Sequence, residues 1–319
     1  MAYHEADLGR VRTVPVAGRR NKVDPALLAR PPAGDQSFKA FLDALPDVLA
    51  ARDLRSVVAG VAGAARQRRG VVLLIGGHVI KVGLGPLIAA WLRRGIVTHV
   101  ALNGAAAIHD FELAAFGGTS EDVESGLADG TFGMAEETGA EMNAAILRAA
   151  ATRQGMGEGL AHALSERAGL PGGQGSVLLA ALECDVPITV HAAIGAEIIH
   201  QHPSADGAAL GATSHRDFLR LAGSLPHLDQ GGAVLNLGSA VVLPEVFLKA
   251  LTIARNLHAG TPTRFLAADF DMQRHYRPRM NVVQRPTRGG GEGYMLTGHH
   301  ELMIPLLAWG VLQELQVAG

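Results

Sequence analysis

The sequence predicts an α/β protein with a mostly parallel, Rossmann-like sheet flanked by helices. Short apolar runs recur along the chain, and each ends in small residues that lead into a segment with apolar side chains at helical spacing. Strands that alternate with helices in this way form parallel sheets whose carboxyl ends line one crevice. Aromatic residues make up only 4% of the 319 residues, so aliphatic side chains must fill the core, as in helix-covered parallel sheets.

Composition argues against several functional classes. A net charge of −2 argues against nucleic acid as a partner, since a phosphate backbone requires a clustered basic surface. The single cysteine, Cys184, excludes an internal disulfide and suits a reducing compartment. No apolar run approaches the roughly 18 residues of a membrane span, and the first residues contain no apolar signal region. We therefore expect a cytoplasmic protein that binds a small-molecule substrate and neither nucleic acid nor a membrane.

The amino-terminal part of the chain divides into two regions. Residues 1–36 are polar and carry Pro31-Pro32, which predicts an extended arm on the body or on a neighbouring subunit; a loose tail is the alternative for the first ten residues. From Ser37 to Gln67, apolar residues recur at helical spacing, and Pro46 is expected to separate two helices. No internal repeat or linker follows, so residues 37–319 are expected to form one domain.

The first expected strand and its turn provide the first candidate site residues. Val71 to Ile75 is expected to form a strand, and Gly76-Gly77-His78 leads into a helix that ends at about Arg94. Such turns bring a ligand close to the backbone. Lys81 is one of four lysines, and an apolar turn would lower its pKa, as an amine nucleophile or imine-forming residue requires. A phosphate contact or an ion pair is the alternative for this lysine.

The second strand repeats the pattern of the first. Val97 to Leu102 is expected to run into Asn103-Gly104-Ala105 and then into a helix that carries His109-Asp110. The imidazole of His109 could serve as a general acid or base, and the neighbouring carboxylate could orient it or tune its pKa. Alternatively, Asp110 is a helix cap, where a negative charge is favourable.

The remaining elements continue the alternation of strands and helices. Strands are expected at 186–190, 233–237, 264–269 and 294–297, and helices at 140–168, 176–182, 215–225, 244–258 and from 298–301 onward. Residues 117–139 are dense in Gly, Ser, Thr, Asp and Glu, which predicts an irregular excursion. Residues 272–293 are rich in Arg, Pro and Gly, which predicts a long loop.

Five segments, taken in order, resemble the deoxyhypusine synthase family over about residues 70–310. They are 76–84, 103–110, 186–202, 234–242 and 297–307. The resemblance implies an NAD-binding fold, a homotetramer and cofactor contacts at Gly76, Gly77, His78, Asn103, Gly104, Ala105, Gly238, Ser239, Gly298 and His299. Small residues at helix starts would let the backbone approach a pyrophosphate, although they also allow helices to pack closely on strands.

The sequence departs from this family in the residues that carry its chemistry. The family's catalytic lysine lies in a Trp-Gly-Lys motif before the last strand, whereas residues 272–293 contain neither lysine nor tryptophan. Glu245 stands near the position of a family histidine, and we regard it as a candidate catalytic residue together with His109, Asp110 and Lys81. We therefore expect an NAD-dependent enzyme of this superfamily that acts on a different small molecule, for example by amine or aminoalkyl transfer.

Two other functions remain open from the sequence. The first is a non-catalytic protein that binds a dinucleotide or metabolite on the same scaffold. The second is a metal-dependent hydrolase or lyase built on His191, His200, His202, His299, His300 and Glu301. No H-E-x-x-H spacing occurs, so we assign no metal ligand. The arginines at 274, 277, 279, 285 and 288 could clamp a carboxylate or phosphate, or lie in a surface loop or subunit contact.

Overall fold

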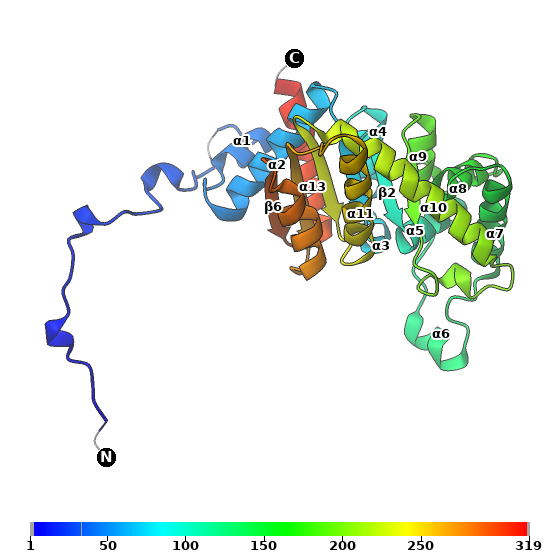
Figure 1. The fold of residues 1–319 in the computed structure, drawn as a ribbon, viewed down its shortest axis with the longest axis horizontal. Coiled ribbons are helices and arrows are strands. Elements are labelled where there is room, and N and C mark those ends of the chain that lie inside the picture. Colours follow the sequence, from blue (N-terminus) through cyan, green and yellow to red (C-terminus); the bar gives the residue numbers. More distant parts are fainter. Residues whose placement is uncertain (1–2, 33, 318–319) are drawn as a thin grey trace.

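The computed structural model describes residues 3–32 and 34–317, and these residues contain a six-stranded, wholly parallel sheet with helices on both faces (Figure 1). The strand order is β3-β2-β1-β4-β5-β6. The strands are β1 (Val71–Ile75), β2 (His99–Asn103), β3 (Ile188–His191), β4 (Gly232–Leu237), β5 (Phe265–Asp271) and β6 (Glu292–Thr297). The predicted fold class is confirmed. The order reverses between β1 and β4, and open α/β sheets bind ligands beside such a switch point.

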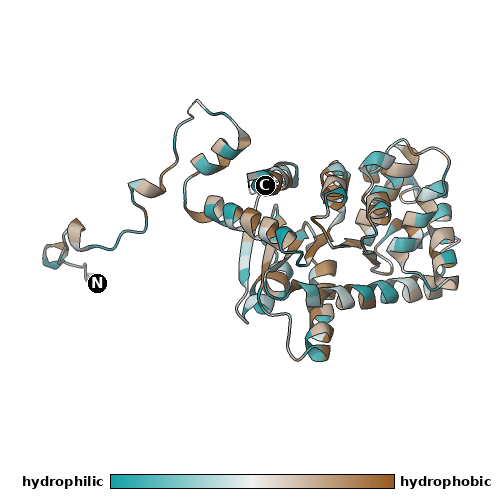
Figure 2. Cartoon of the chain, turned by 90° about the horizontal axis from the view of Figure 1, so that it is seen from above, coloured by the Kyte–Doolittle hydropathy of each residue, from teal (hydrophilic) through white to brown (hydrophobic). Residues whose placement is uncertain are grey.

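The two faces of the sheet bury different sets of helices. One face packs against α2 (Leu49–Arg66), α4 (Gly85–Arg93), α5 (Gly104–Phe116), α9 (Val177–Glu183) and α13 (His300–Val317). The other face packs against α10 (Gly207–Ser224), α11 (Val242–Leu257) and a π-helix (Pro278–Gln284). Figure 2 shows helices on both sides of the strands, with polar and apolar residues alternating along them, as expected where a helix buries one face.

The amino-terminal helices form where the apolar spacing predicts them. Ser37 caps α1 (Phe38–Ala44) by accepting a hydrogen bond from the Ala40 N–H at 3.2 Å. Pro46 lies between α1 and α2, so the expected division into two helices is confirmed. The face of α2 that is buried against the sheet includes Val57 and Val61, four residues apart.

Two expected helices are each divided in the structure. The helix expected up to Arg94 is split into α3 (Gly77–Lys81) and α4, because Gly83 adopts a left-handed conformation with φ of 85°. The helix expected at 140–168 is split into α7 (Glu136–Ala151) and α8 (Met156–Ser165), and Arg153 between them has φ of 60°. Such single left-handed residues leave little signal in the apolar periodicity.

The two segments expected to be irregular contain helices. Residues 117–139 include α6 (Val123–Asp129) and the start of α7. Residues 272–293 include the π-helix and α12 (Arg285–Thr287), and their prediction as a long loop is wrong. Proline and arginine dominate this composition, but Val282 and Val283 are buried against the second face of the sheet and hold the segment in place. The helix expected to begin at 215 begins earlier, at Gly207, where Asp206 caps it.

The amino-terminal arm extends away from the sheet (Figure 1). It contains the short 3₁₀ turns Leu8–Arg10, Val16–Gly18 and Pro25–Leu27; further 3₁₀ turns lie at Gly173–Gly175, Ile198–His200 and Leu225–Leu228. The arm reaches the body near α1, where the Arg30 N–H donates to the Ala44 carbonyl at 2.9 Å. Contact of the arm with a neighbouring subunit remains a prediction. Across the described residues, no helix combines the length and apolar character needed to cross a membrane.

Candidate functional site at the carboxyl ends of β1 to β3

The helices and loops that follow β1, β2 and β3 surround a cavity of about 240 Å³. Its lining comes from α3, α5, the segment around α6 and the loop after β3, namely Lys81, Ala105, Ile108, His109, Glu112, Ser120, Glu121, Val123, Phe132, Ala196, Glu197 and Ile198. Three residues predicted from the sequence, Lys81, Ala105 and His109, therefore meet in one cavity. We refer to it as the carboxyl-edge pocket.

His109 is held in a hydrogen-bonded series that fixes its tautomer. Its Nδ1 lies 2.7 Å from the Thr119 hydroxyl, and Thr119 donates its hydrogen to Glu112 Oε2. Because that hydrogen is committed to a carboxylate, His109 Nδ1 must be the donor to Thr119. The Thr138 hydroxyl donates to the other Glu112 oxygen at 2.9 Å. The series therefore leaves His109 Nε2 as the unprotonated nitrogen, which can accept a proton.

The surroundings of His109 keep its ring neutral. Burial lowers the pKa of His109 from its ordinary value, and the nearby Lys81 ammonium and His78 lower it further. A neutral imidazole whose Nδ1–H is held by a partner is the form required of a general base. The carboxylate that supports it is Glu112, three residues further along α5, rather than the adjacent Asp110.

Asp110 points into the protein and caps a different helix. Its carboxylate is 1% exposed and accepts hydrogen bonds from the Ser176 hydroxyl at 2.7 Å and from the Val177 and Leu178 N–H groups at 2.8 and 2.9 Å. These groups form the start of α9. Burial raises the pKa of Asp110, although each of the three hydrogen bonds lowers it. The expected pairing of Asp110 with the His109 imidazole does not occur, because consecutive helix residues project about 100° apart. The expected capping role is present, but on α9 rather than α5.

Glu197 brings a second carboxylate into the pocket from the loop after β3. It is 7% exposed and accepts a hydrogen bond from the Ala193 N–H at 2.9 Å. Burial raises the pKa of Glu197 and lowers the pKa of His200, whose Nδ1 lies 3.2 Å from Glu197 Oε2. His200 Nδ1 also accepts from the Gly195 N–H at 3.1 Å, so it carries no hydrogen and the contact favours a protonated Glu197. A cation in the pocket would favour the ionised form instead.

The pocket is acidic. Among the described residues that line it, three are glutamates and one is a lysine, Lys81, which is exposed. Both oxygens of Glu121 accept from the Gly133 N–H, at 3.0 and 3.1 Å. The side chains of Ile108, Val123 and Phe132 supply apolar walls. This combination suits a short apolar molecule that carries a positive charge.

The glycines of the β1 and β2 turns serve close packing in the structure. A Cβ on Gly76 would lie 2.1 Å from the Gly238 carbonyl oxygen, and one on Gly77 would lie 2.8 Å from the Ala105 Cβ. A Cβ on Gly104 would lie 2.3 Å from the Glu197 side chain. Atoms of the chain itself thus fill the space that small residues leave at these turns. Asn103 caps α5 by accepting from the Ala106 N–H at 2.9 Å. Close packing within the chain therefore accounts for these glycines, and cofactor contact at the two turns remains a prediction.

The turn after β4 has a different character. Gly238 has φ of 69°, and Ser239 is buried and accepts from the Leu243 N–H at 3.2 Å. Val241 precedes the sixteen-residue α11, is 49% exposed and makes no side-chain cap hydrogen bond. An anion can approach a helix start of this kind. This turn lies beside the switch point of the sheet.

Basic side chains gather beyond this turn, at the carboxyl ends of β5 and β6. Arg274 donates to the Thr297 hydroxyl at 3.1 Å, and Arg277 lies 3.2 Å from Glu245. The predicted catalytic residue Glu245 lies on the first turn of α11 and also contacts Lys249 and Asn281. Its hydrogen bond with Lys249 and the charge of Arg277 lower its pKa. Glu245 thus belongs to the β4 side of the crevice and not to the carboxyl-edge pocket.

The predicted residues of the β1 and β6 turns meet through two histidines. The His78 and His300 rings lie 5.4 Å apart, and His300 lies against Gly238, where a Cβ would be 2.8 Å from its Nε2. His300 Nε2 lies 3.2 Å from the Phe270 carbonyl oxygen, while its buried Nδ1 has no hydrogen-bond partner among the residues that the structure describes. His299 is exposed, and Gly298 packs against Met303. His78, Gly238 and His300 therefore lie together beside the switch point.

The histidines considered as metal ligands lie in separate places. His191 contacts Thr189, His200 contacts Glu197, His202 contacts Ser204 and His300 contacts Phe270. Within the described ranges, no three His, Cys, Asp or Glu side chains form a group able to hold a metal ion. The structure therefore supplies no donor set for the hydrolase hypothesis.

Sequence reasoning missed Glu112, Thr119, Glu121 and Glu197 as site residues. A signal existed for Glu112, because residues three apart on a helix share a face and His109 was already a candidate. Thr119 and Glu121 lie in a segment expected to be irregular, and Glu197 lies in a loop. Their positions depend on how these segments fold back over α5, which periodicity does not encode.

Comparison with known proteins finds only remote similarities. No protein-family model matches the chain, and no curated protein has a matching sequence. Similar solved structures include ArgZ, a cyanobacterial arginine dihydrolase (15% identity, TM-score 0.48, 83% of this chain and 33% of that chain), and AgrE in complex with ornithine and NAD⁺ (18%, 0.48, 83% and 34%). A protein from Entamoeba histolytica assigned as a deoxyhypusine synthase is also similar (10%, 0.48, 87% and 93%). The chain spans about a third of the ArgZ and AgrE chains, and at these identities the likeness concerns the fold.

Proposed function

We propose that the chain is an enzyme that binds a small cationic amine in the carboxyl-edge pocket and removes a proton from it at His109. The observation that carries this proposal is the series His109–Thr119–Glu112, which leaves an unprotonated Nε2 at an acidic pocket. When Nε2 accepts a proton, the imidazolium keeps its Nδ1–H bond to Thr119. Glu112 then stabilises the positive charge through the Thr119 hydroxyl.

The substrate class follows from the lining of the pocket. Glu121 and Glu197 would hold an ammonium group, and Ile108, Val123 and Phe132 would contact an alkyl chain. A cavity of about 240 Å³ lies below the roughly 300–1,000 Å³ of sites for drug-sized ligands, so the substrate is small. Lys81 stands at the rim, where its charge helps to keep His109 neutral.

We further propose that NAD is the cofactor and that it binds on the β4 side of the switch point. Gly238, Ser239 and the start of α11 would approach its phosphates, with Arg274 and Arg277 supplying positive charge. When bound, NAD would supply a hydride acceptor for an amine. The acidic and basic halves of the crevice would thus receive ligands of opposite charge.

Binding measurements test the substrate class. Calorimetric titration with a short linear diamine and with the dicarboxylate of equal length should show binding of the diamine alone. Glu197→Gln keeps the shape of the side chain but cannot become anionic, so it should weaken diamine binding about tenfold. Glu314→Gln, which changes a carboxylate that contacts Arg66 outside the pocket, should leave the affinity unchanged. Equal or tighter binding of the dicarboxylate would contradict the proposal.

The same titrations separate an enzyme from a protein that only binds. His109→Gln should retain diamine affinity, while the diamine-dependent reduction of NAD seen with the unaltered protein should be lost. Diamine binding without any such reduction in the unaltered protein would favour the non-catalytic metabolite-binding function.

A further inference from the structure

Three buried side chains and the half-buried Ser224 form a continuous hydrogen-bonded series along the second face of the sheet. Ser224 Oγ lies 2.8 Å from His99 Nδ1, and His99 Nε2 lies 3.0 Å from Thr189 Oγ1. Thr189 Oγ1 in turn lies 3.0 Å from His191 Nε2. His99 and Thr189 are 0% exposed and His191 is 2% exposed. The series therefore passes through the interior from α10, across β2, to the last residue of β3.

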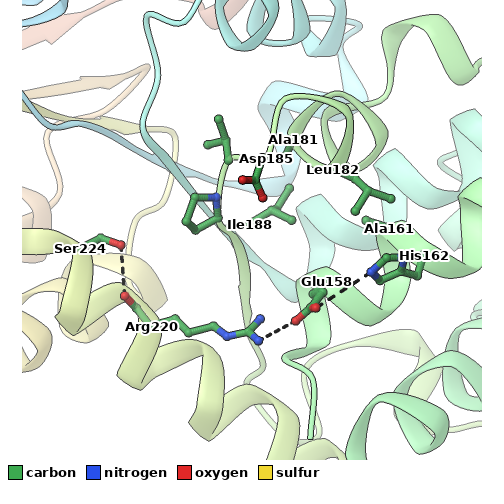
Figure 3. Close-up of a pocket in the computed structure, with 11 residues that line it drawn as sticks. Glu158, Ala161, His162, Ala181, Leu182, Asp185, Ile188, Arg220 and Ser224 are labelled. Carbon is green, nitrogen blue, oxygen red and sulfur yellow. Dashed lines mark hydrogen bonds and ion pairs between the residues drawn. The ribbon is translucent and has the colours of Figure 1, made fainter. Parts of the chain in front are cut away.

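One end of the series lies at the amino ends of the strands and the other at their carboxyl ends. Ser224 lines a second pocket, of about 540 Å³, at the amino end of β3 (Figure 3). Figure 3 shows the bond from Ser224 to the Arg220 carbonyl, with the Arg220 side chain turned away toward Glu158. A pocket of this size holds water. His191 ends β3 at the carboxyl edge, two residues before Ala193, whose N–H binds Glu197.

The donors and acceptors can be satisfied in two arrangements. In the first, Ser224 donates to the Arg220 carbonyl at 3.2 Å, His99 donates from Nδ1 to Ser224, Thr189 donates to His99 Nε2, and His191 donates from Nε2 to Thr189. In the second, Ser224 gives up its bond to the Arg220 carbonyl and the other three bonds are reversed: Ser224 donates to His99, His99 to Thr189 and Thr189 to His191. His191 Nδ1 carries no hydrogen in the first arrangement and one hydrogen in the second.

Both histidines remain neutral in the folded protein. Burial lowers the pKa of His99 and of His191 to about 3, and Arg220 on α10 adds to the effect at His99. Further titratable groups near this part of β3 are Asp217, which accepts from the Val190 N–H at 2.8 Å, and Glu158 and Asp185, which line the pocket beside Ile188. A neutral imidazole has one donor and one acceptor nitrogen, so it can take a proton at one side while giving one at the other.

We propose that Ser224, His99, Thr189 and His191 are a proton relay between the amino-end pocket and the carboxyl edge of the sheet. A proton added to His191 Nδ1 passes the Nε2 hydrogen to Thr189, the Thr189 hydrogen to His99 Nε2 and the His99 Nδ1 hydrogen to Ser224. The Ser224 hydroxyl releases its hydrogen to water in the amino-end pocket. One proton enters and one leaves, so no charge remains in the interior, and the relay can run in either direction. It does not depend on which ligand the carboxyl-edge pocket binds.

Hydrogen exchange of the His99 ring tests the relay. In ¹⁵N-histidine-labelled protein, exchange of the His99 ring N–H with water is measured by NMR beside exchange of the Val100 backbone N–H, which donates to the Pro187 carbonyl at 3.0 Å. Thr189→Val removes the hydroxyl at nearly constant shape and interrupts the relay. It should slow His99 ring exchange by about tenfold or more while Val100 exchange stays constant or becomes faster. Thr189→Ser keeps a hydroxyl and should retain the fast ring exchange.

If the series has only a structural role, the opposite change in the exchange rates is expected. If the series only stabilises the fold, Thr189→Val leaves two buried nitrogens without partners, and ring and backbone exchange should both accelerate through easier opening. That result would overturn the relay. Ser224→Ala interrupts the other end at a half-buried position and should also slow ring exchange, so a second variant decides the matter if Thr189→Val does not fold. Unchanged ring exchange in Ser224→Ala would equally contradict the relay.

Discussion

His109 and Asp110 are adjacent in the chain and serve different parts of the molecule. His109 faces the carboxyl-edge pocket, whereas Asp110 is buried against the start of α9. Asp110 accepts three hydrogen bonds, two of them from the Val177 and Leu178 N–H groups at the buried start of α9. Removal of its carboxylate would leave these buried donors without their acceptor. The residue therefore holds α9 in place beside α5.

Asp110→Ala should lower the free energy of unfolding by about 3 kcal/mol, because two backbone N–H groups lose their cap in the interior. Asp206→Ala is the matched control, since Asp206 caps α10 through one bond to the Ala209 N–H at 2.8 Å and is exposed; it should cost about 1 kcal/mol. Urea unfolding of both variants measures the difference. A smaller loss for Asp110→Ala than for Asp206→Ala would show that the α9 cap is not important for stability.

Among the individual site residues, those on helices and at strand ends could be predicted from the sequence. His109, Lys81 and Ala105 follow predicted strands, and the carboxyl ends of parallel strands must meet, so their convergence could be expected. Thr119 and Glu197 could not be found in this way. They reach the pocket from loops. Tertiary packing brings them to their partners, and no fixed sequence spacing indicates it.

Strand β3 is an outermost strand of the sheet, and side chains of α10 bind the backbone groups on its unpaired edge. Asp217 Oδ2 accepts from the Val190 N–H at 2.8 Å and from the Gly157 N–H, in the first turn of α8, at 2.9 Å. Ser214 donates to the Val190 carbonyl and accepts from the Ala192 N–H, at 3.2 and 3.0 Å. These bonds satisfy backbone groups that an edge strand would otherwise offer to another chain. Asp217 thus joins α8, β3 and α10.

The stability of the protein should depend on pH through Asp217. Burial raises the pKa of this carboxyl from 3.8 to about 7, so between these values the folded state holds a proton that the unfolded state has lost. The contribution of Asp217 to the free energy of unfolding therefore falls as pH rises from about 4 to about 7, by on the order of 4 kcal/mol. Asp217→Asn keeps an oxygen acceptor and cannot ionise, so it should remove this contribution.

Urea unfolding of the unaltered protein and of Asp217→Asn at a series of pH values measures this effect. The difference between the two proteins should favour the variant increasingly from pH 4 to pH 7. The comparison also removes the opposite contribution of the buried His99 and His191, whose lowered pKa values reduce stability as the solution becomes acidic. A constant difference across this range would show that Asp217 titrates normally.

Regular elements were more predictable than their boundaries. All six strands were expected near their observed positions, because each buried run is short and followed by small residues. The division of α3 from α4 and of α7 from α8 depends on single residues with positive φ, and the π-helix depends on two buried valines within a polar composition. In each case a local conformation or a tertiary contact outweighs the average character of the segment.

The carboxyl edge of the sheet has two chemically different halves. The β1 to β3 half is an acidic pocket with a neutral histidine, and the β4 to β6 half carries the start of α11 and exposed arginines. The parallel sheet and its reversal at β1 and β4 place both halves along one edge. The fold class could be predicted from the recurrence of strand and helix. The separation of charge could not, because it arises from loops that cross the carboxyl edge.

The protonation of His109, with and without a ligand, tests the central claim most directly. The ring is followed by NMR over a pH series in the free protein and in the presence of a saturating diamine. We expect an Nδ1–H tautomer with a pKa below its ordinary value of 6.5, and a further decrease of this pKa when the diamine binds, because a nearby cation disfavours the imidazolium. An increase in the His109 pKa on binding, or no change at all, would contradict the proposal that a cationic amine binds beside this base.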